Sequence, residues 1–169
     1  ASKAAMEIAI ESWKKSFSGH SNWQTDKLFI STARAGNVIG GGDWSQDRLV
    51  PDFVKAIDAG EKLIIRSPNS KRPWQFILEP LWGYLSLAKK IYDKNQISLT
   101  KAKFRDSYNF GPKPEANRSV EELVKLLILY WKGNYEVLQN NNQYYESKLL
   151  HLVSDKAKEY LNWEQKMDF

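Results

Sequence analysis

Apolar residues recur along the chain at two spacings, which predict helices and strands in alternation. Spacings of three and four residues predict helices at residues 1–17, 50–60, 80–92, 119–131 and 154–161. Short β-branched or aromatic runs predict extended segments at residues 27–34, 62–66, 104–110, 135–138 and 149–153. Strands separated by helices indicate the α/β fold class.

Turn and capping signals refine these limits. The run SPNSKRP, residues 67–73, predicts a turn-rich loop. Ser119 and Glu122 form a capping-box pattern at the start of the fourth helix. Pro80 fits the first turn of the third helix, where its missing N–H costs no hydrogen bond. Ser154 is expected to cap the last short helix.

The first helix is apolar on two sides. One side carries Met6, Ile10, Trp13 and Phe17. The other carries the smaller residues Ala5, Ile8, Ala9 and Ser12, and a charged stripe between them holds Lys3, Glu7, Glu11 and Lys14. Such a helix is usually covered twice, so we expect it between a sheet and a second helix or subunit. The chain starts inside this helix without an initiator methionine, and we expect it to be part of a longer protein.

A glycine break at residues 40–42 follows the first predicted strand, in the stretch TARAGNVIGGGDWSQDRLVPD. Strand, polar turn, glycines and helix start, in that order, are typical of the crevice where open α/β sheets hold ligands. Glycine lets the backbone approach a ligand closely. Alone, such a run is more often a simple loop. Its polar and aromatic neighbours favour a site: Arg34, Asn37, Asp43, Trp44, Asp47 and Arg48.

The composition limits the partners. A chain of 169 residues suits one core, and its net charge of +5 suits an anionic partner. The basic residues are scattered without a block, which favours a small anion such as a diphosphate over nucleic acid. No apolar run is long enough to span a membrane, and no signal peptide is visible. The absence of cysteine suits a reducing compartment, and we expect a cytoplasmic protein. Only His20 and His151 are present, so no metal site is predicted.

Several segments resemble the extended branch of the short-chain dehydrogenase/reductase family, and within it the CDP-glucose 4,6-dehydratases. These segments are ASKAAMEIA, TARAGNVIGGGDW, DRLVPDFVKAIDAG, RPWQFILEPLWGYL and YNFGP. The sequence departs from the family at Phe76, where a histidine is usual, and at Asn162, where a glycine is usual. No G-x-G-x-x-G turn occurs in the chain. The resemblance therefore implies a partial Rossmann-type fold that is mostly substrate-binding region.

The resemblance also implies a reaction. The family oxidises the sugar at C4 with bound NAD, which makes the C5 proton acidic; water then leaves from C5–C6 and hydride returns to C6. CDP-D-glucose would become CDP-4-dehydro-6-deoxy-D-glucose, for deoxysugar and surface-polysaccharide biosynthesis. Residues 1–40 would end the dinucleotide-binding domain, and residues 41–169 would form a mixed α/β region for the nucleotide sugar.

Lys3 matches the lysine of the family's Tyr-x-x-x-Lys motif, whose tyrosine would lie two places before Ala1. That tyrosine must act as a base near neutral pH, although the pKa of free tyrosine is about 10. A neighbouring ammonium favours the phenolate, so the resemblance implies that Lys3 is catalytic and also bonds the nicotinamide ribose. Arg34 and Ala35 would lie near the nicotinamide end of NAD. Without the resemblance, Lys3 is an ordinary surface lysine.

The remaining candidates would bind CDP-glucose. Asn37 can place an N–H on a diphosphate oxygen, and Arg48 and Arg72 can neutralise the diphosphate bidentately. The other candidates would flank the base or wall the sugar: Leu49, Ile65, Arg66 and Trp74. Glu79 is expected to be structural and to tie a loop to a helix.

Three functions stay open at this stage. The first is the dehydratase, the second a nucleotide-sugar epimerase, and the third a non-catalytic nucleotide-binding or oligomerisation module. The residues that separate dehydration from epimerisation lie upstream in this family. Without a glycine-rich turn and a tyrosine base, the 169 residues alone are expected to lack dehydratase activity. We also expect a homo-oligomer formed through the first helix.

Overall fold

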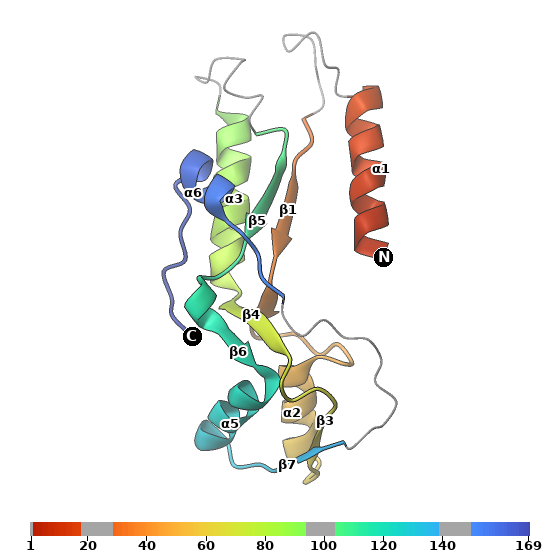
Figure 1. The fold of residues 1–169 in the computed structure, drawn as a ribbon, viewed down its shortest axis with the longest axis vertical. Helices are drawn as coiled ribbons and strands as arrows, with labels where there is room; N and C mark the ends of the chain where they lie inside the picture. Colours follow the sequence, from red (N-terminus) through yellow and green to blue (C-terminus); the bar gives the residue numbers. More distant parts are fainter. Residues whose placement is uncertain (1, 18–28, 94–103, 139–149) are drawn as a thin grey trace.

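The computed structural model describes residues 2–17, 29–93, 104–138 and 150–169. It confirms the α/β class, because helices alternate with strands that pair mainly in parallel. The molecule is elongated, with a larger sheet-and-helix layer at one end and a cluster of short strands and two helices at the other (Figure 1).

The first layer is built on two parallel strands, β1 (Thr32–Ala35) and β5 (Ser107–Phe110). Helix α1 (Ser2–Phe17) lies on one side of them, and α3 (Leu78–Tyr92) and α6 (Asp155–Leu161) lie on the other (Figure 1). The core between the strands and α3 and α6 consists of Leu87, Phe104, Tyr108, Phe110, Ala157, Leu161 and Trp163.

The second part holds two small sheets. In the first, β4 (Lys71–Phe76) lies between β2 (Asn37–Ile39), which is parallel to it, and β6 (Asn117–Ser119), which is antiparallel. In the second, β3 (Leu63–Ile65) runs parallel to β7 (Tyr135–Val137). Helices α2 (Leu49–Asp58) and α5 (Val120–Tyr130) pack on these strands, and a short 3-10 turn, η1 (Pro114–Ala116), precedes β6. The second core is Phe53, Leu63, Ile65 and Val124.

The predicted helices are confirmed, with small shifts at their ends. The capping box is present: the Ser119 hydroxyl accepts from the Glu122 N–H at 3.1 Å, and the Glu122 carboxylate accepts from the Ser119 N–H at 2.6 Å. Glu79 is structural, as expected. It is buried, and its carboxylate accepts the N–H groups of Lys166 and Met167, which ties the C-terminal segment to the start of α3.

The loop predicted at residues 67–73 is partly wrong, because β4 begins at Lys71 and runs through Pro73. Proline lacks the N–H that a ladder needs and normally argues against a central strand. Here the pairing with β6 ends at Pro73 and the pairing with β2 starts at Trp74, so the missing donor falls between the two ladders. The three-residue strands β2 and β6 were also not predicted.

The C-terminal region differs from the prediction in two places. Residues 150–153 form no strand, and residue 149 lies outside the described residues. Ser154 precedes α6, but its hydroxyl makes no capping bond; it bonds the backbone N–H and C=O of Gly111 at 2.8 and 3.2 Å. Asn162 ends α6 with φ of 57°, which explains why a glycine would serve at this position.

Helix α1 is covered less than predicted. Met6, Ile8, Trp13 and Phe17 are each more than half exposed. The charged stripe, instead of an apolar face, is turned toward the strands, since Glu7 contacts β1 and Lys14 is buried. Among the described helices, none combines the length and the apolarity needed to cross a bilayer.

Gly83 in α3 yields a stability prediction. A Cβ at Gly83 would lie 2.2 Å from the Phe110 ring, which itself packs edge-on against Trp163 at 5.2 Å. Gly83→Ala should therefore lower the free energy of unfolding by a net amount of about 1 kcal/mol or more, because overpacking outweighs the gain in helix propensity. Urea denaturation followed by tryptophan fluorescence measures this.

Gly41→Ala is the matched control, because a Cβ at Gly41 would meet no atom within 4 Å. It should change the free energy of unfolding by no more than about 0.5 kcal/mol. Equal effects of the two substitutions would show that the α3–β5 contact is looser than described.

Candidate functional site

A cleft of about 290 Å³ lies between the end of β2, the start of α2 and strand β4. Its polar lining residues are Asn37, Asp43, Asp47, Arg48 and Arg72. Its apolar lining includes Leu49, Trp74 and Val120. Asn37, which begins β2, and Gly40, the first residue of the glycine break, thus line one hollow.

The glycines beside the cleft serve different purposes. A Cβ at Gly40 would lie 2.7 Å from the Ile77 side chain, so Gly40 allows the β2 end to pack on the start of α3. Gly42 has φ of +83°, a conformation that glycine adopts without strain. Gly36, between β1 and β2, lies so close to β4 that a Cβ would be 2.6 Å from the Pro73 carbonyl oxygen. Close contacts at Gly36 and Gly40 and the positive φ of Gly42 together set the path of the backbone beside the cleft.

Strand β4 supplies the buried wall of the cleft. Arg72 and Trp74 are two residues apart, so both side chains lie on the same face of the strand. Each is less than a tenth exposed. The Arg72 guanidinium donates to the Lys71 carbonyl oxygen at 2.8 Å, and the Trp74 indole N–H donates to the Arg118 carbonyl oxygen at 3.0 Å. These bonds fix a cation and an aromatic ring in the wall.

The loop before α2 forms the opposite, exposed rim. Arg48 is exposed and occupies the position just before α2. Asp47 has a φ of 59° and pairs with Arg66 at 3.2 Å. The pKa of Asp43 is lowered, chiefly because its carboxylate accepts the Ser45 N–H, with a smaller contribution from the nearby Arg48 charge. Trp44 is 62% exposed and is not among the residues that line the cleft.

The structure brings together five of the predicted site residues in this cleft: Asn37, Arg48, Leu49, Arg72 and Trp74. Ile65 lies beneath them in the apolar core and is 2% exposed. Arg66 is mostly exposed and is held at the rim by Asp47. Lys3, Arg34 and Ala35 do not line the cleft.

Arg34 lines a second hollow, a groove of about 580 Å³ between α1 and the strands. Its Nε donates to the Glu7 carboxylate at 2.7 Å, and one terminal nitrogen donates to the Asn109 side-chain oxygen at 3.2 Å. The hydrogen bond between Arg34 and Glu7 lowers the pKa of Glu7 and raises the pKa of Arg34. The sequence reasoning missed the partnership, because Glu7 and Arg34 are far apart in the chain.

Lys3 is exposed in the first turn of α1. The N-terminal end of α1 lies beside the carboxyl end of β1, because the helix and the strand run in opposite directions (Figure 1). Ala35 ends β1, and Asn37 begins β2 two residues later. Lys3 is therefore at the end of the sheet from which the chain leads into the cleft.

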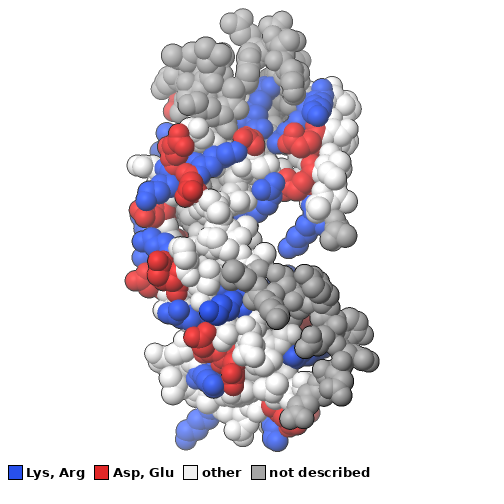
Figure 2. All heavy atoms as spheres, in the orientation of Figure 1, with Lys and Arg blue, Asp and Glu red and all other residues white. Residues whose placement is uncertain are grey.

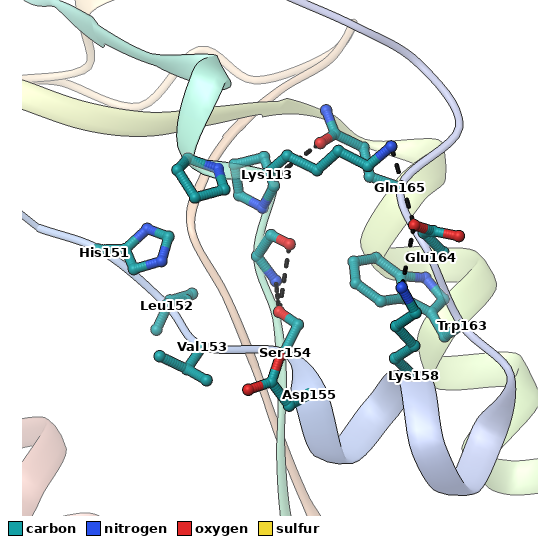
Figure 3. Close-up of a pocket in the computed structure, with 13 residues that line it drawn as sticks. Lys113, His151, Leu152, Val153, Ser154, Asp155, Lys158, Trp163, Glu164 and Gln165 are labelled. Atoms are coloured by element: carbon teal, nitrogen blue, oxygen red, sulfur yellow. Dashed lines mark hydrogen bonds and ion pairs between the residues drawn. The ribbon is translucent and has the colours of Figure 1, made fainter.

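A third hollow, of about 300 Å³, lies beyond the carboxyl end of β5 (Figure 3). Lys113 and Lys158 both point toward Glu164, at 3.8 and 3.5 Å (Figure 3). The Gln165 side chain accepts the Lys113 backbone N–H at 2.7 Å. Because its two lysines share a carboxylate, this hollow suits an anion less well than the cleft.

Comparison with known proteins places these features in context. No family model matches the chain. A CDP-glucose 4,6-dehydratase of Salmonella typhimurium (strain LT2) is 37% identical over 163 residues, which cover 96% of this chain and 44% of that protein. The chain thus spans less than half the length of this relative.

Solved structures share the fold at low sequence identity. A dTDP-glucose 4,6-dehydratase of Bacillus anthracis in complex with NAD matches with a TM-score of 0.68 at 18% identity, over 99% of this chain and 47% of that one. A UDP-glucose 4-epimerase of Thermotoga maritima with UDP-glucose matches with a TM-score of 0.67 at 22% identity, over 98% and 47%.

These matches agree with the sequence in two respects. The parallel strands and flanking helices correspond to about half of a Rossmann-type nucleotide-sugar dehydratase or epimerase. The identity to the Salmonella protein extends over nearly the whole chain. Sequence and fold together confirm the resemblance of this chain to CDP-glucose 4,6-dehydratase, in the extended branch of the short-chain dehydrogenase/reductase family.

Proposed function

We propose that this chain forms the nucleotide-sugar-binding part of an NAD-dependent CDP-glucose 4,6-dehydratase, which converts CDP-D-glucose to CDP-4-dehydro-6-deoxy-D-glucose and water. The observation that carries the proposal is the convergence of Asn37, Arg48 and Arg72 on one cleft. The 37% identity to a protein of that name supports it.

The cleft suits a nucleoside diphosphate sugar. Arg72 is buried in the wall, where water screens its charge less than at the surface, so an anionic oxygen gains more from it. Arg48 on the opposite rim can bind the second phosphate, and Asn37 can donate an N–H without adding charge. Leu49 and the Trp74 ring offer apolar surface for the sugar or the base, and Arg66 is close enough to the rim to join them.

The NAD-contacting residues of this chain would be Lys3, Arg34 and Ala35. Their places in the chain support this assignment, because Lys3 is exposed in the first turn of α1, and Arg34 and Ala35 are the last two residues of β1. The chain contains no glycine-rich turn for the NAD diphosphate. When bound, NAD would accept and return the hydride. Lys3 would bond the nicotinamide ribose and, by its charge, stabilise the phenolate of a tyrosine base.

The division of the chain follows from these roles. We propose that residues 1–40 complete a dinucleotide-binding domain and that residues 41–169 form the nucleotide-sugar-binding region, with β5 and α3 returning to pack on the first part. We place the reaction in the cytoplasm, in deoxysugar biosynthesis for surface polysaccharides such as the lipopolysaccharide O-antigen. The lack of cysteine suits that reducing compartment.

A nucleotide-sugar epimerase is the second candidate. The specific observation in its favour is the TM-score of 0.69 to a UDP-glucuronic acid 4-epimerase of Bacillus cereus in complex with UDP-glucuronic acid and NAD. The TM-score to the dTDP-glucose 4,6-dehydratase is 0.68, so the fold favours neither. A non-catalytic nucleotide-binding module is the third candidate, and it would bind without turnover.

Activity of the protein as encoded tests the three candidates. Incubation with CDP-D-glucose and NAD should give a 4-keto sugar, measured by its absorbance in alkali, at a rate far above a protein-free blank. A CDP-linked C4 epimer without the keto sugar would favour the epimerase. Binding of CDP-D-glucose with neither product would favour the module.

Replacement of Arg72 tests the cleft. Arg72→Ala should remove a charge-assisted hydrogen bond of about 1.5–3 kcal/mol, which raises the Kd for CDP-D-glucose roughly 10- to 100-fold. Titration calorimetry measures the Kd. Lys71→Ala is the control, since it removes the same charge from the neighbouring residue, whose side chain is exposed and points away from the cleft. Equal Kd values for the two variants would contradict the assignment.

We further propose that α1 forms a homo-oligomer interface. With about 100° per residue, Ala5, Ala9 and Ser12 lie on the side of α1 opposite Glu7 and Lys14, which face the strands. Met6 and Trp13 flank this small-residue stripe and are more than half exposed. Small residues allow two helices to approach closely, and the exposed aromatic and aliphatic side chains supply apolar area.

Two glutamates on the stripe should break the oligomer. Ala5→Glu/Ala9→Glu places carboxylates where the helices would meet, so sedimentation velocity should show a smaller species than the wild type. Ala4→Glu, on the side of α1 nearer Glu11, is the control and should leave the oligomer intact. An assembly that survives the double substitution would assign the interface to another surface.

A further inference from the structure

We propose that Glu7 is a positioning residue: its carboxylate holds α1 against β1 and thereby sets Lys3 at the carboxyl edge of the sheet. The inference rests on the proposed function and deepens it, because it names the contact that orients the catalytic lysine. Glu7 itself is not proposed to touch substrate or cofactor.

Both carboxylate oxygens of Glu7 are used. Oε1 accepts the Arg34 Nε–H at 2.7 Å, and Oε2 accepts the Thr32 hydroxyl at 3.3 Å. Arg34 and Thr32 are two residues apart on β1, so they present their side chains on the same face of the strand. Two contacts on one strand face fix both the rotation and the axial position of the helix.

The contacts continue into the neighbouring strand. Arg34 donates to the Asn109 side-chain oxygen at 3.2 Å, and the Thr32 hydroxyl lies 2.7 Å from that of Ser107. Asn109 and Ser107 are the β5 partners of Arg34 and Thr32 in the strand register. Glu7 is therefore bound to side chains that are themselves held by a second strand.

Apolar packing does little to hold α1 within the described residues. Its largest apolar side chains are mostly exposed, and a groove of about 580 Å³ runs along part of the helix where it faces Arg34 and Ser107 of the strands. Figure 2 shows this hollow, with acidic and basic side chains facing each other across it. The remaining inward residues are Ile10, which is partly exposed, and Lys14, which is buried and pairs with Glu11 at 2.7 Å. The Lys14 charge also lowers the pKa of Asp106, in the segment before β5, so it adds a second polar contribution to the attachment of α1.

Helix geometry connects this attachment to Lys3. Lys3 precedes Glu7 by four residues, so it lies on the same side of α1, about 6 Å further along the axis. Because α1 runs opposite to β1, that step leads past Arg34 toward Ala35 and the strand's carboxyl end (Figure 1). A helix that turned or slid would carry Lys3 away from this edge.

The ion pair remains intact at neutral pH. The hydrogen bond from Arg34 lowers the pKa of Glu7, so the carboxylate stays charged above its ordinary pKa and the contact is lost only as the pH falls through the lowered value. The charged groups near it are Lys14 on its own helix and Arg34 on β1, with Asp106 acting on Arg34 from the segment before β5. The carboxylate is therefore charged at neutral pH.

Glu7→Gln in the protein as encoded tests the proposal. The Kd for CDP-D-glucose should stay within about twofold, because Glu7 does not line the cleft, whereas kcat should fall at least about tenfold. The acidic limb of the pH profile of kcat should move to higher pH, because a displaced Lys3 stabilises the phenolate base less. A general loss of folding would instead weaken binding as well.

Glu11→Gln is the matched control. It is the same substitution on the same helix, and Glu11 pairs with Lys14 of α1 rather than with β1. Its kcat and pH profile should equal those of the wild type. If the thermal melt shows that Glu7→Gln is unstable, Glu7→Asp replaces it, because aspartate keeps the charge and is one methylene shorter. Its kcat should fall below that of the wild type, by less than the roughly tenfold loss expected for Glu7→Gln. Its acidic pH limb should move to higher pH in the same sense.

The outcomes separate the two proposals. An active wild type whose Glu7→Gln or Glu7→Asp variant keeps the wild-type kcat and pH profile overturns the positioning role and leaves the dehydratase intact. A wild type without keto-sugar formation overturns the proposed function and, with it, the role of Glu7. The proposal is supported if the Glu7 variant loses kcat, keeps its Kd and shows a shifted acidic pH limb, while Glu11→Gln shows neither the loss of kcat nor the shift.

Discussion

The double pairing of β4 is the constraint on which the cleft depends. One end of this strand pairs antiparallel with β6, and the other pairs parallel with β2 and leads into α3. Pro73 lies where the first ladder ends and the second begins, and it also contacts the backbone at Gly36. Arg72 and Trp74, on either side of it, are consequently fixed in the wall by backbone pairing rather than by flexible loops.

Like charges also meet on β4, and the structure separates them. Arg72 and Arg118 are direct partners in the antiparallel register, an arrangement that is unfavourable for two cations. The Arg118 guanidinium lies over the Phe169 ring at 5.7 Å, whereas Arg72 lines the cleft. The two guanidinium groups are thus directed to different surroundings although their backbones are paired.

Local signals in the sequence predicted the helices well, because caps and periodic apolar positions act within a few residues. The capping box at Ser119 and the helix end at Gly60, which has φ of +70°, are examples. The same logic failed at β4, where Pro73 resembles a loop residue until its position between two ladders is known. The family resemblance, not a local signal, gave Ile65 as a candidate for flanking the base, and the structure has this residue in the apolar core. Burial depends on which elements pack together, and that information is spread over the whole chain.

The charged stripe of α1 shows why apolar periodicity can misplace a helix. The two apolar faces predict burial on both sides of the helix. In the structure, the side turned to the sheet is the one that carries Glu7 and Lys14. Apolar packing tolerates sliding and rotation, since contacts can re-form in a neighbouring position. A carboxylate bound to two groups on one strand has one favourable position, because moving away leaves Arg34 without this acceptor. Such directional bonds orient a helix more sharply than apolar packing does, and they leave the apolar faces of α1 exposed in this structure.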